Sequence, residues 1–307
     1  MEYTKFQKQI LDRLESFVQE QGSQTKASKI LGFSTSTIST LRKGTYDGNI
    51  EIVTNKLAEY FGIKEEQLKT YSEIEYADTS ISHEIYSIIR VCQVKGGFAI
   101  ACGDAGIGKT KAIKQYLKDN PNNSILITIN PCFTSVKSVL SKLALSIGAV
   151  PEKSKDALWL SVANRLRDGM ILIFDEAQHL TLQTIEVLRS FSDYLADKGQ
   201  TLGIIFIGNT ETVGRMGSKK AQFAQIINRT KQTKMYSVTE IQRNDIKLLF
   251  PLIADCDMEV DFLLKIAQTK QGLRGAVNLF SNAYDNENYT YAGLIAMAKF
   301  MDMGENL

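Results

Sequence analysis

The sequence predicts an α/β protein in which a parallel sheet, built around a phosphate-binding loop, lies between an all-α domain and a helical lid. Three observations predict this fold class. Short apolar runs alternate with helical stretches from residue 98 to about 237, which is typical of a parallel sheet covered by helices. The pattern G-x-x-x-x-G-K-T follows the first apolar run. The flanking regions show helical periodicity only. We therefore expect a helix-turn-helix domain over 1–70, a connector over 71–97, the phosphate-loop core over 98–237 and the lid over 238–307.

The N-terminal domain is predicted from apolar residues at helical spacing. One face of its first helix would consist of Phe6, Ile10, Leu14 and Phe17, with Leu11 and Val18 beside them. Gln24–Lys43 fits a helix-turn-helix, in which Gly32 supplies the turn, Phe33 packs beneath it and Ser34 caps the second helix. The inward positions of these two helices would be Ala27, Ile30, Leu31, Ile38 and Leu41. A further helix would bury Ile50, Val53, Leu57 and Phe61.

The outward face of the second helix of this motif is a candidate DNA surface. It carries short hydroxyl residues and ends in two basic ones, namely Thr35, Ser36, Ser39, Thr40, Arg42 and Lys43. Short hydroxyl side chains can approach a duplex closely and bond phosphates or base edges. The alternative is a helical bundle used only for protein contact, because residues 1–70 carry a net charge of only +1.

The core is predicted as alternating strands and helices. The strands are Phe98–Cys102, Ser124–Asn130, Met170–Asp175, Thr201–Gly208 and Thr233–Val238. The helical stretches are Lys109–Asp119, Ser135–Ile147, Asp156–Arg167, Leu182–Asp197 and Lys219–Asn228. In the connector, Ile85, Ile88, Ile89 and Val91 suggest one more helix that leads into the first strand.

The phosphate-binding loop has the strand–loop–helix context that makes this Walker A pattern credible. Its glycines let backbone N–H groups wrap a phosphate chain, and the following helix N-terminus adds partial positive charge. Lys109 would reach the outer phosphates of ATP, and the Thr110 hydroxyl would ligate Mg²⁺. The expected nucleotide-binding residues are Gly103, Asp104, Ala105, Gly106, Ile107, Gly108, Lys109, Thr110 and Lys111.

Polar residues at two strand ends complete the predicted chemistry. Asp175 and Glu176 follow an apolar strand. Asp175 would hold the Mg²⁺, together with Thr110, and Glu176 would polarise the attacking water. Asn209 ends the next strand and would orient that water beside the γ-phosphate, although a plain Gly-Asn turn is an alternative.

Two arginines are candidates for contact with the phosphates. Arg229 lies just before the last predicted strand, where it could reach the nucleotide of a neighbouring subunit and stabilise transition-state charge. Arg274 opens a lid helix and could contact the same phosphates from within the subunit. Surface salt bridges are the alternative for Arg229 and Arg274. Arg243 and Arg215 are weaker rivals for the role between subunits.

Composition and charge narrow the class of protein. Hydrophobic residues at 44% and charged residues at 23% of 307 are typical of soluble proteins. We expect no membrane span and no signal peptide, and hence a cytoplasmic protein of a bacterium or a phage-infected cell. The four cysteines lack metal-ligand spacing. Residues 71–235 have a net charge of +5 and residues 236–307 a net charge of −4, so an anionic partner should avoid the tail.

Taken in order, the phosphate loop, the Asp-Glu strand end, Asn209, Arg229 and Arg274 resemble the motifs of AAA+ ATPases. The preceding helix-turn-helix and a set of longer segments narrow the resemblance to the Mu-type phage transposition B proteins. These segments are Cys102–Thr110, Thr128–Pro131, Phe174–Leu180 and Phe223–Arg229. The resemblance implies a DNA-stimulated ATPase that uses ATP and Mg²⁺. It also implies subunits that associate into a helical filament on double-stranded DNA and deliver this target to a transposase.

The resemblance also suggests where DNA is contacted in the core. Thr134 and Lys137, in the loop after the second strand, are similar in position to DNA-facing residues of related transposition ATPases. A second basic set comprises Lys153, Lys155, Arg165 and Arg167. Two other functions stay open: a replicative helicase loader with the same ATPase core, and a helix-turn-helix DNA-binding regulator gated by ATP.

Overall fold

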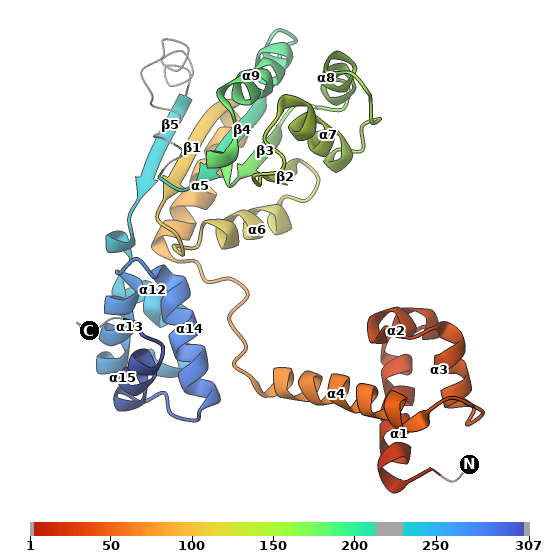
Figure 1. Cartoon of the computed structure of the whole chain (residues 1–307). Helices are drawn as coiled ribbons and strands as arrows, with labels where there is room; N and C mark the ends of the chain where they lie inside the picture. Colours follow the sequence, from red (N-terminus) through yellow and green to blue (C-terminus); the bar gives the residue numbers. More distant parts are fainter. Residues whose placement is uncertain (1–2, 211, 213–229, 304–307) are drawn as a thin grey trace. The chain divides into compact units, whose positions relative to one another are not determined.

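The computed structural model describes residues 3–210, 212 and 230–303 of the chain, which separates into two compact units, Met1–Tyr71 and Ser72–Leu307 (Figure 1). Each unit is described by itself. The division falls one residue after the end of the expected N-terminal domain.

The N-terminal unit is all α-helical, with α1 at Lys5–Glu20, α2 at Gln24–Leu31, α3 at Thr35–Arg42 and α4 at Ile50–Lys69. Helix α2 ends at Gly32, whose φ of 70° lies in the left-handed region, and Ser34 caps α3 by accepting from the N–H of Thr37. The core of the unit consists of Ile10, Leu14, Val18, Ala27, Ile38, Leu41, Val53, Leu57 and Phe61.

Two of the expected core positions in this unit are wrong. Phe6 is 47% exposed and Ile30 is 48% exposed. The buried stripe of α1 instead runs through residues 10, 14 and 18, and Ser28 fills the inward position of α2, where its hydroxyl donates to the carbonyl of Thr25. An apolar helix face can be wider than the surface that neighbouring helices cover, so periodicity overestimates the buried set.

The second unit contains one parallel sheet among the described residues, with the strand order β2-β3-β4-β1-β5. The strands are β1 Gly97–Gly103, β2 Ser124–Thr128, β3 Met170–Asp175, β4 Leu202–Gly208 and β5 Thr230–Tyr236. This arrangement confirms the predicted α/β fold class. Because all strands run the same way, their carboxyl ends meet at one edge of the sheet.

Helices cover both faces of this sheet (Figure 1). One face packs against α7 (Val136–Ser146), α8 (Lys155–Ala163) and α9 (Leu182–Ala196), which share a core with the strand residues Phe98, Ile100, Leu172, Phe174, Ile204 and Phe206. The other face packs against α5 (Ser80–Lys95), which adjoins α6 (Lys109–Asp119). Since strand side chains alternate between faces, this double cover explains why β1, β3 and β4 are apolar at successive positions.

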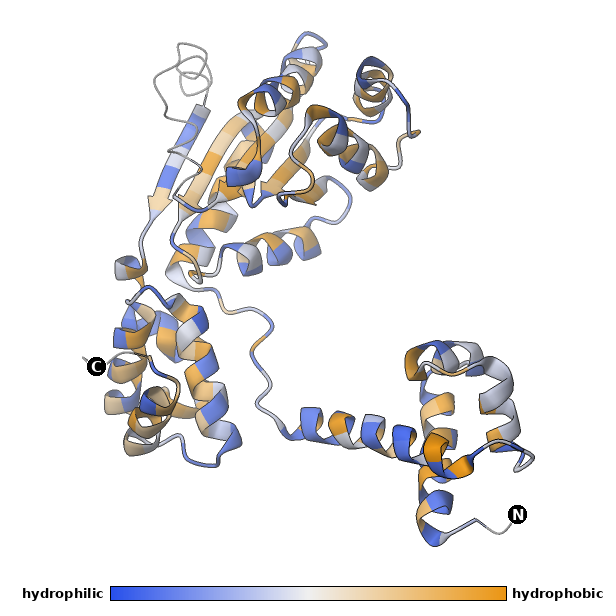
Figure 2. Cartoon of the chain, in the orientation of Figure 1, coloured by the Kyte–Doolittle hydropathy of each residue, from blue (hydrophilic) through white to orange (hydrophobic). Residues whose placement is uncertain are grey.

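Strand β5 differs from the expectation for both its boundaries and its polarity. It begins at Thr230 rather than Thr233 and ends at Tyr236 rather than Val238. Figure 2 shows a largely hydrophilic strand, and only Tyr236 is buried in it. Among the described strands β5 pairs with β1 alone, at the border of the sheet. Most of its side chains therefore stay in water, and its polar start gave no strand signal. Helix α8 also ends four residues before the predicted Arg167.

Residues 238–303 form helices only, including α12 (Arg243–Leu249), α13 (Asp257–Ala267), α14 (Gly272–Asp285) and α15 (Tyr291–Phe300). The predicted helix Lys219–Asn228 lies outside the described residues. Within the described residues, no helix combines the length and the apolarity that crossing a membrane would need.

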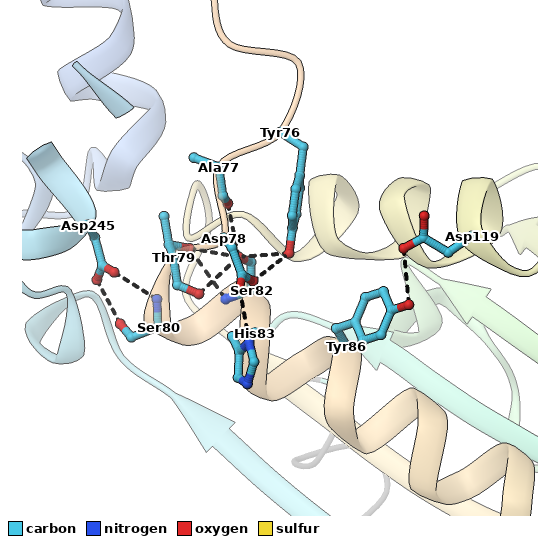
Figure 3. A network of polar contacts seen from close by, with 10 residues as sticks. All are labelled: Tyr76, Ala77, Asp78, Thr79, Ser80, Ser82, His83, Tyr86, Asp119 and Asp245. Carbon is cyan, nitrogen blue, oxygen red and sulfur yellow. Dashed lines mark hydrogen bonds and ion pairs between the residues drawn. The ribbon is translucent and has the colours of Figure 1, made fainter. Parts of the chain in front are cut away.

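A buried carboxylate joins this helical region to the start of α5 (Figure 3). Asp245 of α12 is 2% exposed. Its two oxygens accept from the N–H and the hydroxyl of Ser80, both at 2.7 Å, and from the N–H of Gln242 at 2.8 Å. Thr79 caps α5 beside it by accepting from the N–H of Ser82. The first turn of α5 is thereby attached to the lid side of the unit.

Candidate nucleotide-binding and hydrolysis site

Strand order brings the predicted site residues together. Strand β4 lies between β1 and β3, so Asn209 follows a strand that separates the phosphate loop from the Asp175–Glu176 strand end. The phosphate loop leaves β1 at Gly103, and α6 begins at Lys109. The predicted loop residues therefore lie at the carboxyl edge of the sheet, which is where parallel α/β sheets bind ligands.

Lys109 lies over the backbone of its own loop. Its ammonium group donates to the carbonyl oxygens of Gly103 at 2.9 Å and Asp104 at 2.6 Å. Burial lowers the pKa of Lys109, and the nearby carboxylates of Glu176, Asp175 and Asp104 oppose that shift, with Glu176 exerting the largest effect of the three. A cation held at the loop mouth among these groups is suited to receiving phosphate oxygens.

Thr110 and Asp175 meet where a hard cation would bind. The Thr110 hydroxyl donates to the Asp175 carboxylate at 3.1 Å. Asp175 is 4% exposed, and burial raises the pKa of its carboxyl, because the charged form loses water there. Oxygen ligands of this type suit Mg²⁺, which is usually bound by one or two protein groups together with phosphate oxygens and water. The two residues therefore fit the predicted metal.

Glu176 is exposed, in contrast to its buried neighbour. Its backbone has φ 58° and ψ 37°, the left-handed conformation, which non-glycine residues rarely adopt outside functional turns. The turn ends β3 abruptly and directs the next three residues, Ala177–His179, into a short 3-10 helix. This geometry separates the roles of the two acids, with Asp175 inside and Glu176 at the open edge.

Gln178 is a site residue that the sequence reasoning missed. It is 6% exposed, and its amide nitrogen donates to the Glu176 carboxylate at 2.5 Å. Its amide oxygen accepts from the backbone N–H of Asn209 at 3.3 Å. A polar residue two positions after an acidic strand end was the available signal, but the sequence alone could not show that a second strand end lies within its reach.

The lid helix α14 starts directly against the phosphate loop. The N–H of Arg274 donates to the carbonyl of Gly106 at 3.3 Å. Gly272 has φ +64°, and a Cβ there would lie 2.7 Å from the carbonyl oxygen of Ala105, so only glycine allows this approach. The loop is also joined to the chain after β5, since the Asp104 carboxylate accepts from the N–H of Val238 at 2.9 Å. Arg274 itself is exposed.

The other basic residues predicted near the phosphates either lie outside the described residues or face nearby carboxylates. Arg229 and Arg215 lie outside the described residues. The guanidinium of Arg243 is paired with Asp257 at 2.5 Å and Asp261 at 2.6 Å, which disfavours it as a phosphate ligand. Lys111 is exposed and lies 3.6 Å from the Glu73 carboxylate.

The candidate DNA residues of α3 engage largely in local contacts. Arg42 forms a two-point ion pair with Glu15, with nitrogen–oxygen distances of 2.6 and 2.7 Å. The Thr40 hydroxyl donates to the carbonyl of Ser36, and the Thr35 hydroxyl lies 3.2 Å from that of Ser28. Ser39 is partly buried, whereas Lys43 is exposed.

The loop between β2 and α7 is more open. Phe133 of this loop is 42% exposed, and Lys137, in the first turn of α7, is also exposed. The backbone carbonyl of Thr134 accepts from the Thr184 hydroxyl at 3.0 Å. Thr184 belongs to the first turn of α9, the helix that follows the 3-10 turn after Glu176. The loop is thereby attached to the segment that carries the predicted catalytic base.

Comparison with known proteins defines the class of protein. Residues 93–216 match the AAA domain family. The fold resembles Cdc6p of Pyrobaculum aerophilum, with a TM-score of 0.53, 13% identity and coverage of 71% of this chain and 66% of that chain. It also resembles the ORC2 protein of Aeropyrum pernix in its ADP form, with a TM-score of 0.52, 11% identity and coverage of 70% and 67%. The chain is thus similar to AAA+ ATPases in sequence over residues 93–216 and in fold.

Two relatives in sequence match this chain over most of its length. The ATP-dependent target DNA activator B of Escherichia phage Mu is 29% identical in an alignment of length 258 that covers 79% of this chain and 77% of that protein. The Mu-like prophage FluMu DNA transposition protein B of Haemophilus influenzae is 25% identical over 274 residues, or 86% and 93%. The chain is thus similar to the Mu-type B proteins over most of its length, as the sequence motifs predicted.

Proposed function

We propose that this chain is an ATP-dependent DNA-binding ATPase that assembles as a filament on duplex target DNA and delivers the DNA to a transposase. One observation supports it above the others. Lys109, Thr110, Asp175 and Glu176 lie at one sheet edge in a chain that aligns over 79% of its length with a protein named for ATP-dependent activation of target DNA.

ATP would act as the link between subunits. Thr110 and Asp175 would hold Mg²⁺, and the bound ion would supply positive charge to offset the negative charge that develops during hydrolysis. Arg229 of one subunit would contact the γ-phosphate held by Lys109 of the next. Because a ligand shifts an equilibrium only through its different affinity for two states, ATP and ADP must differ at this contact for the nucleotide to control assembly.

DNA would be contacted separately by each unit: by the loop residue Thr134 together with Lys137 of the first turn of α7 in the second unit, and by the outward face of α3 in the N-terminal unit. The exposure of Lys137 and the attachment of the loop to α9 through Thr184 support this choice, since the loop would then respond to the segment after Glu176. Single phosphate contacts are weak, but they add up along a filament. Binding should therefore weaken steeply with salt.

Electron microscopy of the full chain with duplex DNA tests the proposal. Filaments should form with ATP and Mg²⁺, and should be absent with ADP and without nucleotide. Lys109→Ala should abolish the ATP-dependent filaments, whereas Lys114→Ala, which removes an exposed lysine from the same helix, should leave them intact. Equal polymerisation with and without nucleotide would refute the coupling.

The role of Glu176 is tested by how long assemblies of a Glu176 variant stay on DNA. Glu176→Gln should bind ATP but hydrolyse it poorly, because a neutral amide cannot accept a proton from water. Its assemblies should therefore outlast those of the parent protein when free ATP is removed. Dissociation as fast as that of the parent would show that hydrolysis at Glu176 does not release the DNA.

The two alternative functions predict different results with the same protein. A replicative helicase loader would retain a replicative helicase, and not a transposase, in a pull-down. A DNA-binding regulator gated by ATP would protect one short sequence in a footprint and form no filament. Either result would replace the proposal.

A further inference from the structure

The side chain of Gln178 spans the ends of two neighbouring strands of the ATPase site. Its amide nitrogen lies 2.5 Å from a carboxylate oxygen of Glu176, after β3, and its amide oxygen lies 3.3 Å from the backbone nitrogen of Asn209, after β4. We propose that Gln178 is a positioning residue for ATP hydrolysis, which holds the Glu176 carboxylate toward the phosphates and fixes it relative to Asn209. The inference rests on the ATPase activity of the class and not on filament formation.

The orientation of the Gln178 amide follows from its two partners. The backbone N–H of Asn209 can only donate, so it must face the amide oxygen. The Glu176 carboxylate accepts, so it faces the amide NH₂ group. A reversed amide would place a donor against a donor and an acceptor against an acceptor. The bridge therefore has one satisfactory arrangement, and its bond to the carboxylate is the stronger because one partner is charged.

The surrounding backbone holds Gln178 in place and leaves little freedom. The residue is 6% exposed and belongs to the 3-10 turn Ala177–His179. A Cβ at Gly208 would collide with the amide oxygen of Gln178, so the last residue of β4 has to be a glycine for the amide to reach this position. The left-handed backbone of Glu176 turns the chain back toward the same place.

Glu176 has no comparable support from burial, because it is exposed. A free glutamate side chain samples several rotamers, and fixing it has an entropic cost. The carboxylate is close to the phosphate site, since among the surrounding carboxylates it has the largest effect on the pKa of Lys109. The bond from Gln178 therefore restricts the orientation of the carboxylate and fixes it relative to the Asn209 backbone, beside the site of Lys109.

This geometry predicts a specific defect in hydrolysis. A general base contributes about 10²- to 10⁴-fold to a rate, and only when it is placed against the proton that it accepts. Gln178→Ala should reduce kcat for ATP by about 10- to 100-fold. The Kd for ATP should change by less than about twofold, because Lys109, Thr110 and the loop backbone are not altered.

Single-turnover hydrolysis by the full chain, without DNA, tests whether Gln178 acts through Glu176. Gln178→Ala is measured alone and in the Glu176→Gln background, together with ATP affinity. If Gln178 only positions the carboxylate, its removal should have no further effect once Glu176 is neutralised, which is the coupling that a double-mutant cycle detects. Gln115→Ala is the matched control, because Gln115 also donates to a carboxylate, that of Asp119 at 3.0 Å, but on the surface of α6. It should change nothing in either background.

Gln178→Glu serves as a second variant with the same shape. It exchanges the donor that faces Glu176 for a second carboxylate, so the rate of hydrolysis should fall at least as far as in Gln178→Ala. If the alanine variant does not fold, Gln178→Glu takes its place in the double-mutant cycle. The proposal is overturned if the folded variants hydrolyse ATP within twofold of the parent. It is also overturned if ATP affinity falls together with the rate, or if the loss is the same in the Glu176→Gln background.

Discussion

Replacing Asp175 with asparagine should make the nucleotide-free protein more stable, although it removes a ligand from the metal site. Asp175 is 4% exposed, and burial raises the pKa of its carboxyl above the ordinary value. The charge of Glu176 acts in the same direction, whereas hydrogen bonds from the Glu176 N–H and the Thr110 hydroxyl act against it. Because the pKa is raised overall, the folded protein disfavours the charged carboxylate relative to water. A site kept for function in this way reduces stability.

The size of the effect follows from the contacts of the side chain. An asparagine has the same shape, and its oxygen can accept from the Glu176 N–H, at 3.0 Å in the native protein. The Thr110 hydroxyl, which donates to Asp175 at 3.1 Å, can rotate and accept from the new amide. The substitution thus removes a buried charge while both hydrogen-bond partners of the side chain, the Glu176 N–H and the Thr110 hydroxyl, are kept. We expect a gain of about 1 kcal/mol, or a rise in Tm of about 2–4 °C for a unit of this size.

Thermal unfolding with a chelator and without nucleotide measures this gain. Asp175 keeps its proton to a higher pH in the folded protein than in the unfolded chain. The advantage of asparagine should therefore be small below the ordinary aspartate range, should grow as the pH rises through the raised pKa, and should be complete at pH 8. With ATP and Mg²⁺ added, the parent should gain more than the variant.

Asp168→Asn is the control with the opposite sign. Hydrogen bonds from the N–H and the hydroxyl of Thr201 lower the pKa of Asp168, which is exposed. Its contribution to stability is present above the unfolded pKa and is lost as the pH falls, so its removal should lower Tm at pH 8. If Asp175→Asn unfolds at or below the Tm of the parent at pH 8 while Asp168→Asn behaves as expected, the argument from buried charge is refuted.

Two further predictions concern the rest of the second unit. Asp245→Ala leaves the N–H and hydroxyl of Ser80 without their buried acceptor. It should lower the free energy of unfolding of the unit by about 2–4 kcal/mol, as measured in urea. A decrease below about 1 kcal/mol would mean that water replaces the carboxylate. Brief alkylation at pH 8 should modify only Cys132 and Cys256 in the native protein, because the other two thiols are buried and burial raises the pKa of Cys92 to about 12. Mass spectrometry should then show two adducts, against four after denaturation, and a third adduct on native protein would contradict the burial.

The parts of the fold that local pattern determines were predictable. The phosphate loop and the strand that ends at Asp175 are continuous in the chain, so their residue types and spacing contain the required information. The contrast between a buried Asp175 and an exposed Glu176 also follows from a strand that stops at the sheet edge. The polar strand β5 was harder to predict, because an edge strand needs no apolar pattern. The predicted start of β5 was three residues too late, since the strand begins at Thr230.

Periodicity also failed where one helix face had more apolar residues than its neighbours cover. Phe6 and Ile30 match the helical spacing, yet both are largely exposed. In the same unit the sequence places Arg42 next to a hydroxyl-rich face and predicts a DNA contact for it. In the structure Arg42 pairs with Glu15, which lies 27 positions earlier in the chain. Whether a given side chain is buried or paired depends on which helices meet, and helical spacing within one segment does not contain that information.

The residue types along the chain were sufficient to identify a phosphate loop, an acidic strand end and helical domains on either side of a parallel sheet, because each of these is specified by neighbours in sequence. Tertiary structure alone decided that β4 lies between β1 and β3, and so brought Asn209 within reach of Gln178. It likewise placed Ser80 against Asp245, 165 positions away. Such contacts depend on how strands and helices are ordered in space, and that order results from the packing of the whole unit.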